Sequence, residues 1–268
     1  MHNVHLSEVD HLPVDVLPIG TDYPPGYVLA QHAHRRAQLL YGAQGVMQVD
    51  TEEGSWTVPT HRAVLIPPGT VHEVLMDAVT TWSLYIEPDA VPWWPTRCIV
   101  AEISPLLREL LRTANGLAVD YDATGRDSAV VDLILHELRE LTPTPLSVSL
   151  PHDEPFRSLC RQYLADPDLA VSNEEWARIA NRSVRTFDRQ FLAQTGTSPA
   201  AWRSRARLLT GLRMLPSSTV TEVASRLGYS SPAAFTAAFT RAFGLAPTRY
   251  VAHSGSDGGA QLRRGCES

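Results

Sequence analysis

Lysine is absent from this chain of 268 residues, so arginine provides all 23 of its basic side chains. Cysteine is scarce: Cys98, Cys160 and Cys266 are scattered without C-x-x-C spacing, which excludes a disulfide framework or a cysteine-based zinc module. No apolar run approaches the roughly 18 residues of a membrane-spanning helix, and the N-terminus lacks a charged segment followed by an apolar one. The sequence therefore predicts a cytoplasmic protein that has no membrane partner.

Acidic and basic residues are distributed unevenly along the chain. Residues 1–171 contain 10 arginines and 23 acidic residues, whereas residues 172–268 contain 13 arginines and 6 acidic residues. The net charge of −6 therefore combines an acidic part, at −13, with a basic part, at +7. This asymmetry is expected when only one domain of a protein meets nucleic-acid phosphates, although a basic half that is merely solvated is the alternative.

Residues 177–244 contain one pattern twice. Its members in the first copy are Ala177, Asn181, Ser183, Phe187, Phe191 and Gly196, and those in the second are Ala224, Gly228, Ser230, Phe235, Phe239 and Gly244. The second copy has one extra residue after its serine. Each copy predicts a short helix, a tight turn, a capping serine and a second helix with aromatics at i and i+4, which is a helix-turn-helix unit. Two such units, joined by an arginine-rich helical segment, favour DNA binding.

The second helix of the first unit is the predicted main reader of DNA. If Phe187 and Phe191 define its buried face, its arginines point outward near its N-terminal end, which suits bidentate pairing with guanine in the major groove. Arginines of the joining segment are expected to contact phosphate or to pair with acidic neighbours. The second unit offers mostly small side chains and is predicted to be the weaker reader. The candidate DNA contacts are Ser183, Arg185, Thr186, Asp188, Arg189, Arg203, Arg207, Ser230, Ser231, Ala233 and Thr236.

Residues 20–90 consist of short apolar stretches separated by proline and glycine. Gly45–Thr51 and Ser55–Val58 are predicted to form a hairpin, and 63–67, 72–78 and 81–86 are further predicted strands. This spacing indicates an antiparallel barrel or sandwich. Met47, Trp82 and Tyr85 lie on the predicted strands, where they either line an effector pocket or belong to the core.

Helical patterns begin after this region. Ser104 followed by Pro105 is a helix start, and leucine stripes over 105–113 and 128–141 predict amphipathic helices. These stripes exceed what one barrel face needs to cover, so we expect a homodimer through both helices, the alternative being that they pack within the chain. Residues 142–151, with three prolines, are predicted to be a linker.

Three histidines and a glutamine form a candidate metal site. His32 and His34 are two residues apart and would share one face of a strand, Gln38 would join them from a neighbouring turn or strand, and His72 follows a Pro-Pro-Gly turn. Three imidazoles and one oxygen ligand suit Zn, Ni, Fe, Mn or Cu. The alternative is a dry or ligand-filled barrel that these histidines line. Arg35 and Arg36 are expected on the surface at a strand end, the alternative being that one of them presents its charge to an anionic effector.

The two histidine motifs, Gly26-x5-His32-x-His34-x3-Gln38-x6-Gly45 and Pro67-x-Gly69-x2-His72, resemble the paired motifs of the cupin superfamily. The resemblance implies a β-barrel that holds one divalent transition metal. Gln38 occupies the place of the usual glutamate, which makes the site less anionic. His61 and Met76 replace the glycine and asparagine that flank the second motif.

Residues 155–252 resemble the AraC/XylS family of bacterial transcription regulators. The resemblance is carried by 176–180, Ser183-x3-Phe187-x3-Phe191, Gly196-x-Ser198-Pro199, Arg207-Leu208, 228–239, Phe243-Gly244 and Pro247-x2-Tyr250. It implies a DNA operator as partner and, for an activator, RNA polymerase. Ala237 stands where the family often has an arginine. The runs 34–41 and 104–110 are similar to a subgroup thought to control efflux or detoxification genes.

The predicted fold is α+β with two domains, an antiparallel cupin or jelly-roll barrel followed by an all-α tandem helix-turn-helix domain. The predicted parts are a sensor domain (1–100), dimerisation helices and a linker (101–150), a DNA-binding domain (151–252) and a flexible tail (253–268). The predicted function is a DNA-binding transcription regulator that senses a small molecule or metal. The alternatives are a cupin isomerase or oxygenase fused to a DNA-binding module, and a constitutive DNA-binding protein whose barrel only dimerises.

Overall fold

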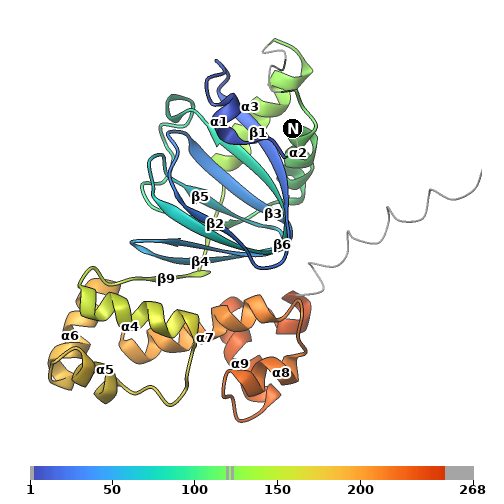
Figure 1. Cartoon of the computed structure of the whole chain (residues 1–268). Coiled ribbons are helices and arrows are strands. Elements are labelled where there is room, and N and C mark those ends of the chain that lie inside the picture. The colour runs from blue at the N-terminus through green and yellow to red at the C-terminus, as the bar shows by residue number, and fades with distance from the viewer. Residues whose placement is uncertain (1–2, 119–120, 122–123, 251–268) are drawn as a thin grey trace, which may run out of the picture. The chain divides into compact units, whose positions relative to one another are not determined.

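A computed structural model describes residues 3–118, 121 and 124–250, and the predicted tail at 253–268 lies outside these residues. The chain divides into two compact units, Met1–Ser147 and Val148–Ser268 (Figure 1). The first is an antiparallel sheet domain and the second is helical, so the predicted α+β fold is confirmed. In the described parts of the chain, no helix is long and apolar enough to cross a membrane.

The first unit is organised around one long strand. Its strands are β1 (Val16–Tyr23), β2 (Tyr27–His32), β3 (Ala37–Thr51), β4 (Gly54–Pro59), β5 (Arg62–Ile66), β6 (His72–Ile86), β7 (Ile99–Glu102) and β8 (Pro143–Thr144), with β9 (Ser147–Ser149) at the boundary between the units. On one side β6 pairs with β1 and β2, and on the other it pairs with β3 along its whole length. β3 in turn pairs with β4 and β5, which confirms the hairpin predicted around residue 52.

The sequence predicted two strands where β6 is continuous. A bulge explains the misleading pattern: Ala78 has a positive φ of 50°, and burial changes from the even positions 72–76 before it to the odd positions 79–83 after it, before Leu84 and Ile86 are buried again. Gly45 lies opposite, also at positive φ, and a Cβ there would collide with the carbonyl oxygen of Ala78. The bulge therefore shifts the alternation of side chains by one residue without ending the strand.

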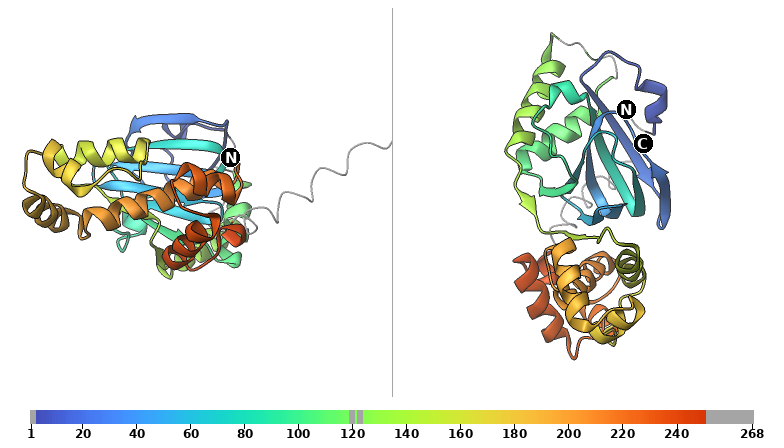
Figure 2. Two further views of the ribbon diagram at one scale, coloured as in Figure 1. Left: turned by 90° about the horizontal axis from the view of Figure 1, so that it is seen from below. Right: turned by 90° about the vertical axis from the view of Figure 1, so that its left-hand side faces the viewer.

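Two helices, α2 (Pro105–Asn115) and α3 (Arg126–Arg139), lie against one face of the sheet (Figure 2). Ser104 caps α2 by accepting a hydrogen bond from the Leu107 amide, as its sequence predicts. The apolar stripes of both helices are buried in one core with sheet residues. Members of this core include Leu107, Leu111, Val131, Ile134, Leu138, Leu39, Tyr41, Leu84 and Ile86.

This packing corrects the prediction that the leucine stripes are free for a partner. Leu107 and Leu111 are completely buried, so aspartates there would unfold the unit and would not produce a folded monomer. Leu106 and Leu133 are the leucines of these helices that face solvent, at 51% and 41% exposure.

The predicted linker at 142–151 is partly built into the sheet. β8 pairs with β7, and the Thr57 amide donates a 2.9 Å hydrogen bond to the carbonyl of Leu146. The prolines indicated a break in regular structure, but Pro143 occupies a strand at the end of the sheet order, where proline is tolerated.

Arg36 was expected on the surface and is completely buried. Its guanidinium pairs with Asp10 at 2.9 Å and with Glu87 at 2.7 Å, and it donates to the carbonyls of Leu12 and Val14. Arg35 pairs with the same two carboxylates but remains half exposed. The N-terminal segment that contains α1 (Leu6–Val9) is thereby fixed to the sheet through one buried cation.

The second unit is built from two aromatic clusters. Its helices are α4 (Glu154–Ala165), α5 (Asn173–Ile179), α6 (Val184–Thr195), α7 (Pro199–Met214), α8 (Val220–Arg226) and α9 (Pro232–Phe243). Trp176 and Phe191 pack against Trp202 of α7, and Phe187 packs against Trp176, with ring centroids about 6 Å apart. In the other cluster Phe235 and Phe239 contact each other. The aromatic pairs at i and i+4 thus form the cores that the repeat predicted.

Replacing Arg36 should destabilise the first unit far more than replacing its neighbour. Arg36→Met leaves backbone carbonyls and carboxylates without their buried partner, for which we expect a loss of about 3 kcal/mol in the free energy of unfolding. Arg35→Met removes the same charge from an exposed position and should cost less than about 1 kcal/mol. Urea unfolding followed by circular dichroism measures both. Equal losses would show that burial of Arg36 is unimportant.

Candidate functional site

The first helix-turn-helix consists of α5 and α6. Asn181 turns the chain at a positive φ of 54°, and the Arg182 amide donates to the carbonyl of Ala177 at 2.8 Å. Ser183 then caps α6 by accepting from the Thr186 amide. The predicted turn and cap are confirmed here.

The second helix-turn-helix consists of α8 and α9 and uses the same turn with a different residue. Gly228 takes the positive φ, at 72°, and the Tyr229 amide donates to the carbonyl of Ala224 at 2.9 Å. The capping serine is Ser231, which accepts from the Ala234 amide, and not Ser230 as predicted. The extra residue of this copy therefore precedes the cap, and each cap stands four residues before the first phenylalanine.

The outward face of α6 carries the arginines that the sequence predicted there. Arg185 and Arg189 are exposed, and Thr186 is half-buried because its hydroxyl accepts a hydrogen bond from Ser183. Arg182, in the turn, is exposed as well and was missed as a candidate contact. Its place one residue before the cap was the available signal, since side chains at a recognition-helix N-terminus lie nearest the groove.

The corresponding face of α9 is nearly devoid of charge. Ser230 and Ala233 are exposed, while Ser231 and Thr236 are half-buried. Small side chains of this kind touch a thymine methyl group but form few hydrogen bonds with bases.

Two residues that were predicted to contact DNA instead join α5, α6 and α7 to one another. Arg203 is only 6% exposed, and its guanidinium lies 4.8 Å from the ring centroid of Trp176. It donates to Asn173 Oδ1 at 2.7 Å, and Asn173 donates to Asp188 at 2.9 Å. This network engages Arg203, which is buried, and Asp188, which is half-buried, within the helical domain, so in this structure neither side chain is free for DNA.

Arg207, the other predicted phosphate contact, is also engaged within the unit. Its Nη1 donates a 2.6 Å hydrogen bond to the hydroxyl of Tyr163 on α4, and its Nε is buried.

In the sheet domain the three histidines lie close together as predicted, but they do not share one face of a strand. His32 ends β2, His34 lies in the connection that follows, and His72 begins β6 directly opposite His32. The ring centroid of His72 is 4.3 Å from that of His32 and 5.2 Å from that of His34. The Gly69 amide donates to the His34 carbonyl at 2.8 Å, so the Pro-Pro-Gly turn itself holds His72 beside His34.

In each of the three imidazoles, Nδ1 is hydrogen-bonded to a backbone carbonyl oxygen. The distances are 2.8 Å from His32 to Ala30, 2.6 Å from His34 to Arg36 and 2.8 Å from His72 to Thr70. Burial lowers the pKa of His34 and lowers that of His72 to about 4, so both rings are neutral at pH 7. A neutral ring that donates from Nδ1 has an unprotonated Nε2, which is the form that binds metals.

Gln38 extends this cluster from β3. Its Oε1 lies 3.0 Å from Nε2 of His34, and its amide nitrogen donates to the hydroxyl of Tyr85 at 3.0 Å. The Tyr85 ring also stands at 5.2 Å, edge to face, against His34. The structure therefore brings His32, His34, Gln38 and His72 together with Tyr85.

The rest of the predicted effector pocket is divided between two faces of the sheet. Tyr85 packs toward Leu17 and Ile19, whereas Trp82 joins the core under α2 and α3 and stacks on Tyr41 at 5.6 Å. Positions 82 and 85 lie on opposite faces because successive side chains of a strand alternate. Met47 is completely buried. Trp82 and Tyr85 therefore do not line one pocket.

The profile of the helix-turn-helix domain family matches residues 176–253, and that of the AraC-like ligand binding domain matches residues 17–159, more than half of the chain. The transcriptional regulator NimR of Escherichia coli (strain K12) is 31% identical over 223 residues, which cover 82% of this chain and 81% of NimR. The chain belongs to the AraC family of transcription regulators. Its DNA-binding role and its ligand-binding type of sensor domain follow from this membership.

Two solved structures are similar to this chain, one over part of its length and the other over most of it. The DNA-binding domain of AdpA, in complex with a target DNA, is 36% identical and covers 37% of this chain and 91% of that chain, with a TM-score of 0.35. ToxT from Vibrio cholerae is 8% identical and covers 90% of this chain and 99% of that chain, with a TM-score of 0.39.

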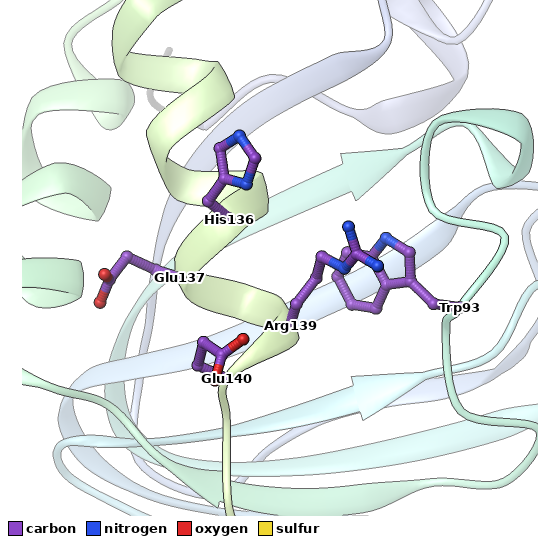
Figure 3. A pocket seen from close by; sticks show the side chains of 5 residues that line it. All are labelled: Trp93, His136, Glu137, Arg139 and Glu140. Atoms are coloured by element: carbon purple, nitrogen blue, oxygen red, sulfur yellow. The ribbon is translucent and has the colours of Figure 1, made fainter.

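A surface hollow lies on α3, on the opposite side of the sheet from the histidines' partner Tyr85. It has a volume of about 520 Å³ and is lined by Trp93, His136, Glu137, Arg139 and Glu140 (Figure 3). The Arg139 guanidinium lies 5.6 Å from the Trp93 ring centroid. This cation–π contact occupies the aromatic surface of the hollow.

Proposed function

We propose that this AraC-family regulator senses a divalent transition metal through His32, His34, Gln38 and His72, and that it transmits occupancy to DNA binding. The observation that carries the proposal is a short distance between two atoms that each have a free electron pair: His34 Nε2 lies 3.0 Å from Gln38 Oε1. When Nδ1 of His34 holds the only proton, these two atoms repel each other unless a cation lies between them. Two ligands bound to one metal at about 2.1 Å each lie roughly 3 Å apart.

The donor set fits Zn, Ni, Fe, Mn or Cu in kind. His32 and His72 add two further Nε2 atoms whose tautomer is fixed by a carbonyl. Within residues 3–118, 121 and 124–250, no three His, Cys, Asp or Glu side chains are arranged to hold a metal as they stand. Binding therefore requires the rings to rotate, and His32 has the most room because it ends β2 and is only half-buried.

A small organic effector is the second candidate, and the hydrogen bonds of Gln38 favour it. A half-turn of the carboxamide would place its NH2 group on His34 Nε2 and its oxygen on the hydroxyl of Tyr85, which satisfies both without a metal. The site would then offer acceptor nitrogens to a ligand rich in hydrogen-bond donors. Efflux or detoxification genes are the proposed targets in either case, from the subgroup that the sequence resembles.

Sensing, and not catalysis, is the proposed role of the sheet domain. The polar groups hydrogen-bonded to His32, His34 and His72 are backbone carbonyls and a carboxamide, so none of these imidazoles is paired with a carboxylate as in a catalytic His–Asp arrangement. The relative NimR is likewise named as a transcriptional regulator.

On DNA, α6 is the proposed principal reader and α9 the weaker one. The exposed Arg182, Arg185 and Arg189 lie on the first helix-turn-helix, whereas α9 offers small side chains. We expect a bipartite site whose halves lie about one helical turn, roughly 34 Å, apart. A homodimer through the exposed leucines of α2 and α3, and contact with RNA polymerase if the protein activates, complete the proposal.

Metal content tests the sensor site. Protein purified without chelator, or reloaded, should contain about one equivalent of metal per chain, and His32→Ala/His72→Ala should contain none because two of three imidazoles are removed. His136→Ala/His152→Ala removes two exposed histidines elsewhere and serves as the matched control in elemental analysis. Equal content in both double variants, or a wild type that cannot be loaded, leaves the organic effector.

DNA selected by the protein tests α6. Arg189→Ala should weaken binding to that DNA by about 1–3 kcal/mol and relax the preference at one base position, because a bidentate base contact is lost. Arg161→Ala, an exposed arginine of α4, is the control in fluorescence anisotropy titrations. Equal weakening on selected and random DNA would assign Arg189 to phosphate.

The oligomeric state tests the leucines that remain exposed. Leu106→Asp/Leu133→Asp should yield a folded monomer that binds operator more weakly, because charges replace apolar surface at the proposed interface. Leu192→Asp, an equally exposed leucine on α6, should stay dimeric in light scattering at micromolar concentration. A monomeric wild type contradicts the proposed dimer.

A further inference from the structure

The two helix-turn-helix units are joined by more than the helix that connects them in sequence. α7 contributes Trp202 to the first aromatic cluster and Gly211 to the second, where a Cβ would lie 3.0 Å from Leu227 and from Phe235. A single shared helix would still allow the two units to rock about its axis.

A second connection lies beside α7. Gly228, in the turn between α8 and α9, approaches Leu169 so closely that a Cβ would lie 3.1 Å from Cβ and Cδ1 of the leucine. Leu169 lies in the connection between α4 and α5, before the first helix-turn-helix, and is 49% exposed. An apolar side chain that is not part of a core is thus placed against the turn of the other unit.

Arg207 adds a polar connection at the same place. Its Nη1 binds the hydroxyl of Tyr163 on α4, and its charge acts on the hydroxyl of Tyr229, the residue that follows Gly228. Burial raises the pKa of Tyr229 and Arg207 partly offsets this rise. Arg207 Nε and Tyr229 Oη are both buried, and the interaction of Arg207 with the Tyr229 hydroxyl opposes the effect of burial on that group.

We propose that Leu169, Arg207, Gly228 and Tyr229 form a seam that fixes α6 and α9 relative to each other and so sets the spacing of DNA half-sites that the protein accepts. The inference rests on the proposed two-part reading of DNA. It makes Arg207 a positioning residue and not a phosphate contact. The seam joins the connection between α4 and α5 to the turn that precedes α9, so a small rotation there displaces the base contacts of α9 relative to those of α6.

The consequence is a penalty for altered spacing. One inserted base pair moves the half-sites apart by about 3.4 Å and rotates them by about 36°. A rigid pair of helices cannot follow this change, whereas a pair that rocks about α7 can follow part of it.

The experiment uses DNA selected by the wild-type protein, together with versions in which one base pair is inserted between the half-sites or one half-site is scrambled. The wild type should lose about tenfold or more in affinity on the inserted DNA. Arg207→Met and Leu169→Ala should lose less than about threefold, with little change on a single half-site. Arg161→Met, which removes one exposed positive charge from α4, should behave as the wild type.

The outcomes separate the possible failures. If scrambling either half-site leaves wild-type affinity unchanged, the two-part reading is wrong and the seam has no role in it. Spacing penalties that are unchanged in both variants contradict the seam alone. Uniform weakening of Arg207→Met on all DNA, with a salt slope lower by about one, assigns Arg207 to phosphate. The Leu169→Ala variant is the control for a folding defect. Because Leu169 is half exposed, this substitution should leave thermal unfolding nearly unchanged.

Discussion

The register of β6 against its two neighbours is the constraint on which the sensor domain depends. Pairing with β2 sets His72 opposite His32, and pairing with β3 sets Tyr85 opposite Gln38. These two pairs lie at opposite ends of a strand of 15 residues, and the bulge at Ala78 shifts the alternation of side chains by one residue, so that His72 and Tyr85 can both contact His34. A register shift of one residue would move the side chains of β6 to the opposite faces of the sheet and separate His72 and Tyr85 from their partners.

Local signals in the sequence predicted the parts of this fold that local chemistry determines. Ser104, Ser183 and the hairpin near residue 52 were found because caps and turns depend on a few adjacent residues. Ser231 was missed as the cap because the repeat was aligned on Ala224, and counting back four residues from Phe235 would have found it. The continuity of β6 was missed because the bulge reverses the burial pattern, and only pairing with β3 reveals it.

Buried arginines account for most of the errors about the candidate sites. Arg36 and Arg203 were read as exposed because a charged side chain usually is. Each is buried with acceptors that are distant in sequence: Asp10 and Glu87 for Arg36, and Asn173 for Arg203. A guanidinium presents five donors in a plane, so it can satisfy several such acceptors at once. In a chain without lysine, arginine therefore provides both the buried structural cross-links and the exposed positive charges, and only the fold distinguishes the two.

The way in which Arg36 holds the N-terminal segment has a consequence for divergence among relatives. Apart from Asp10, its partners in that segment are backbone oxygens, those of Leu12 and Val14 among them. Backbone acceptors are the same for every amino acid, so substitutions at these positions keep the anchoring bonds and change only the surface that the segment presents. The bonds from Arg36 to these carbonyls therefore fix the path of the segment whatever side chains stand at positions 12 and 14.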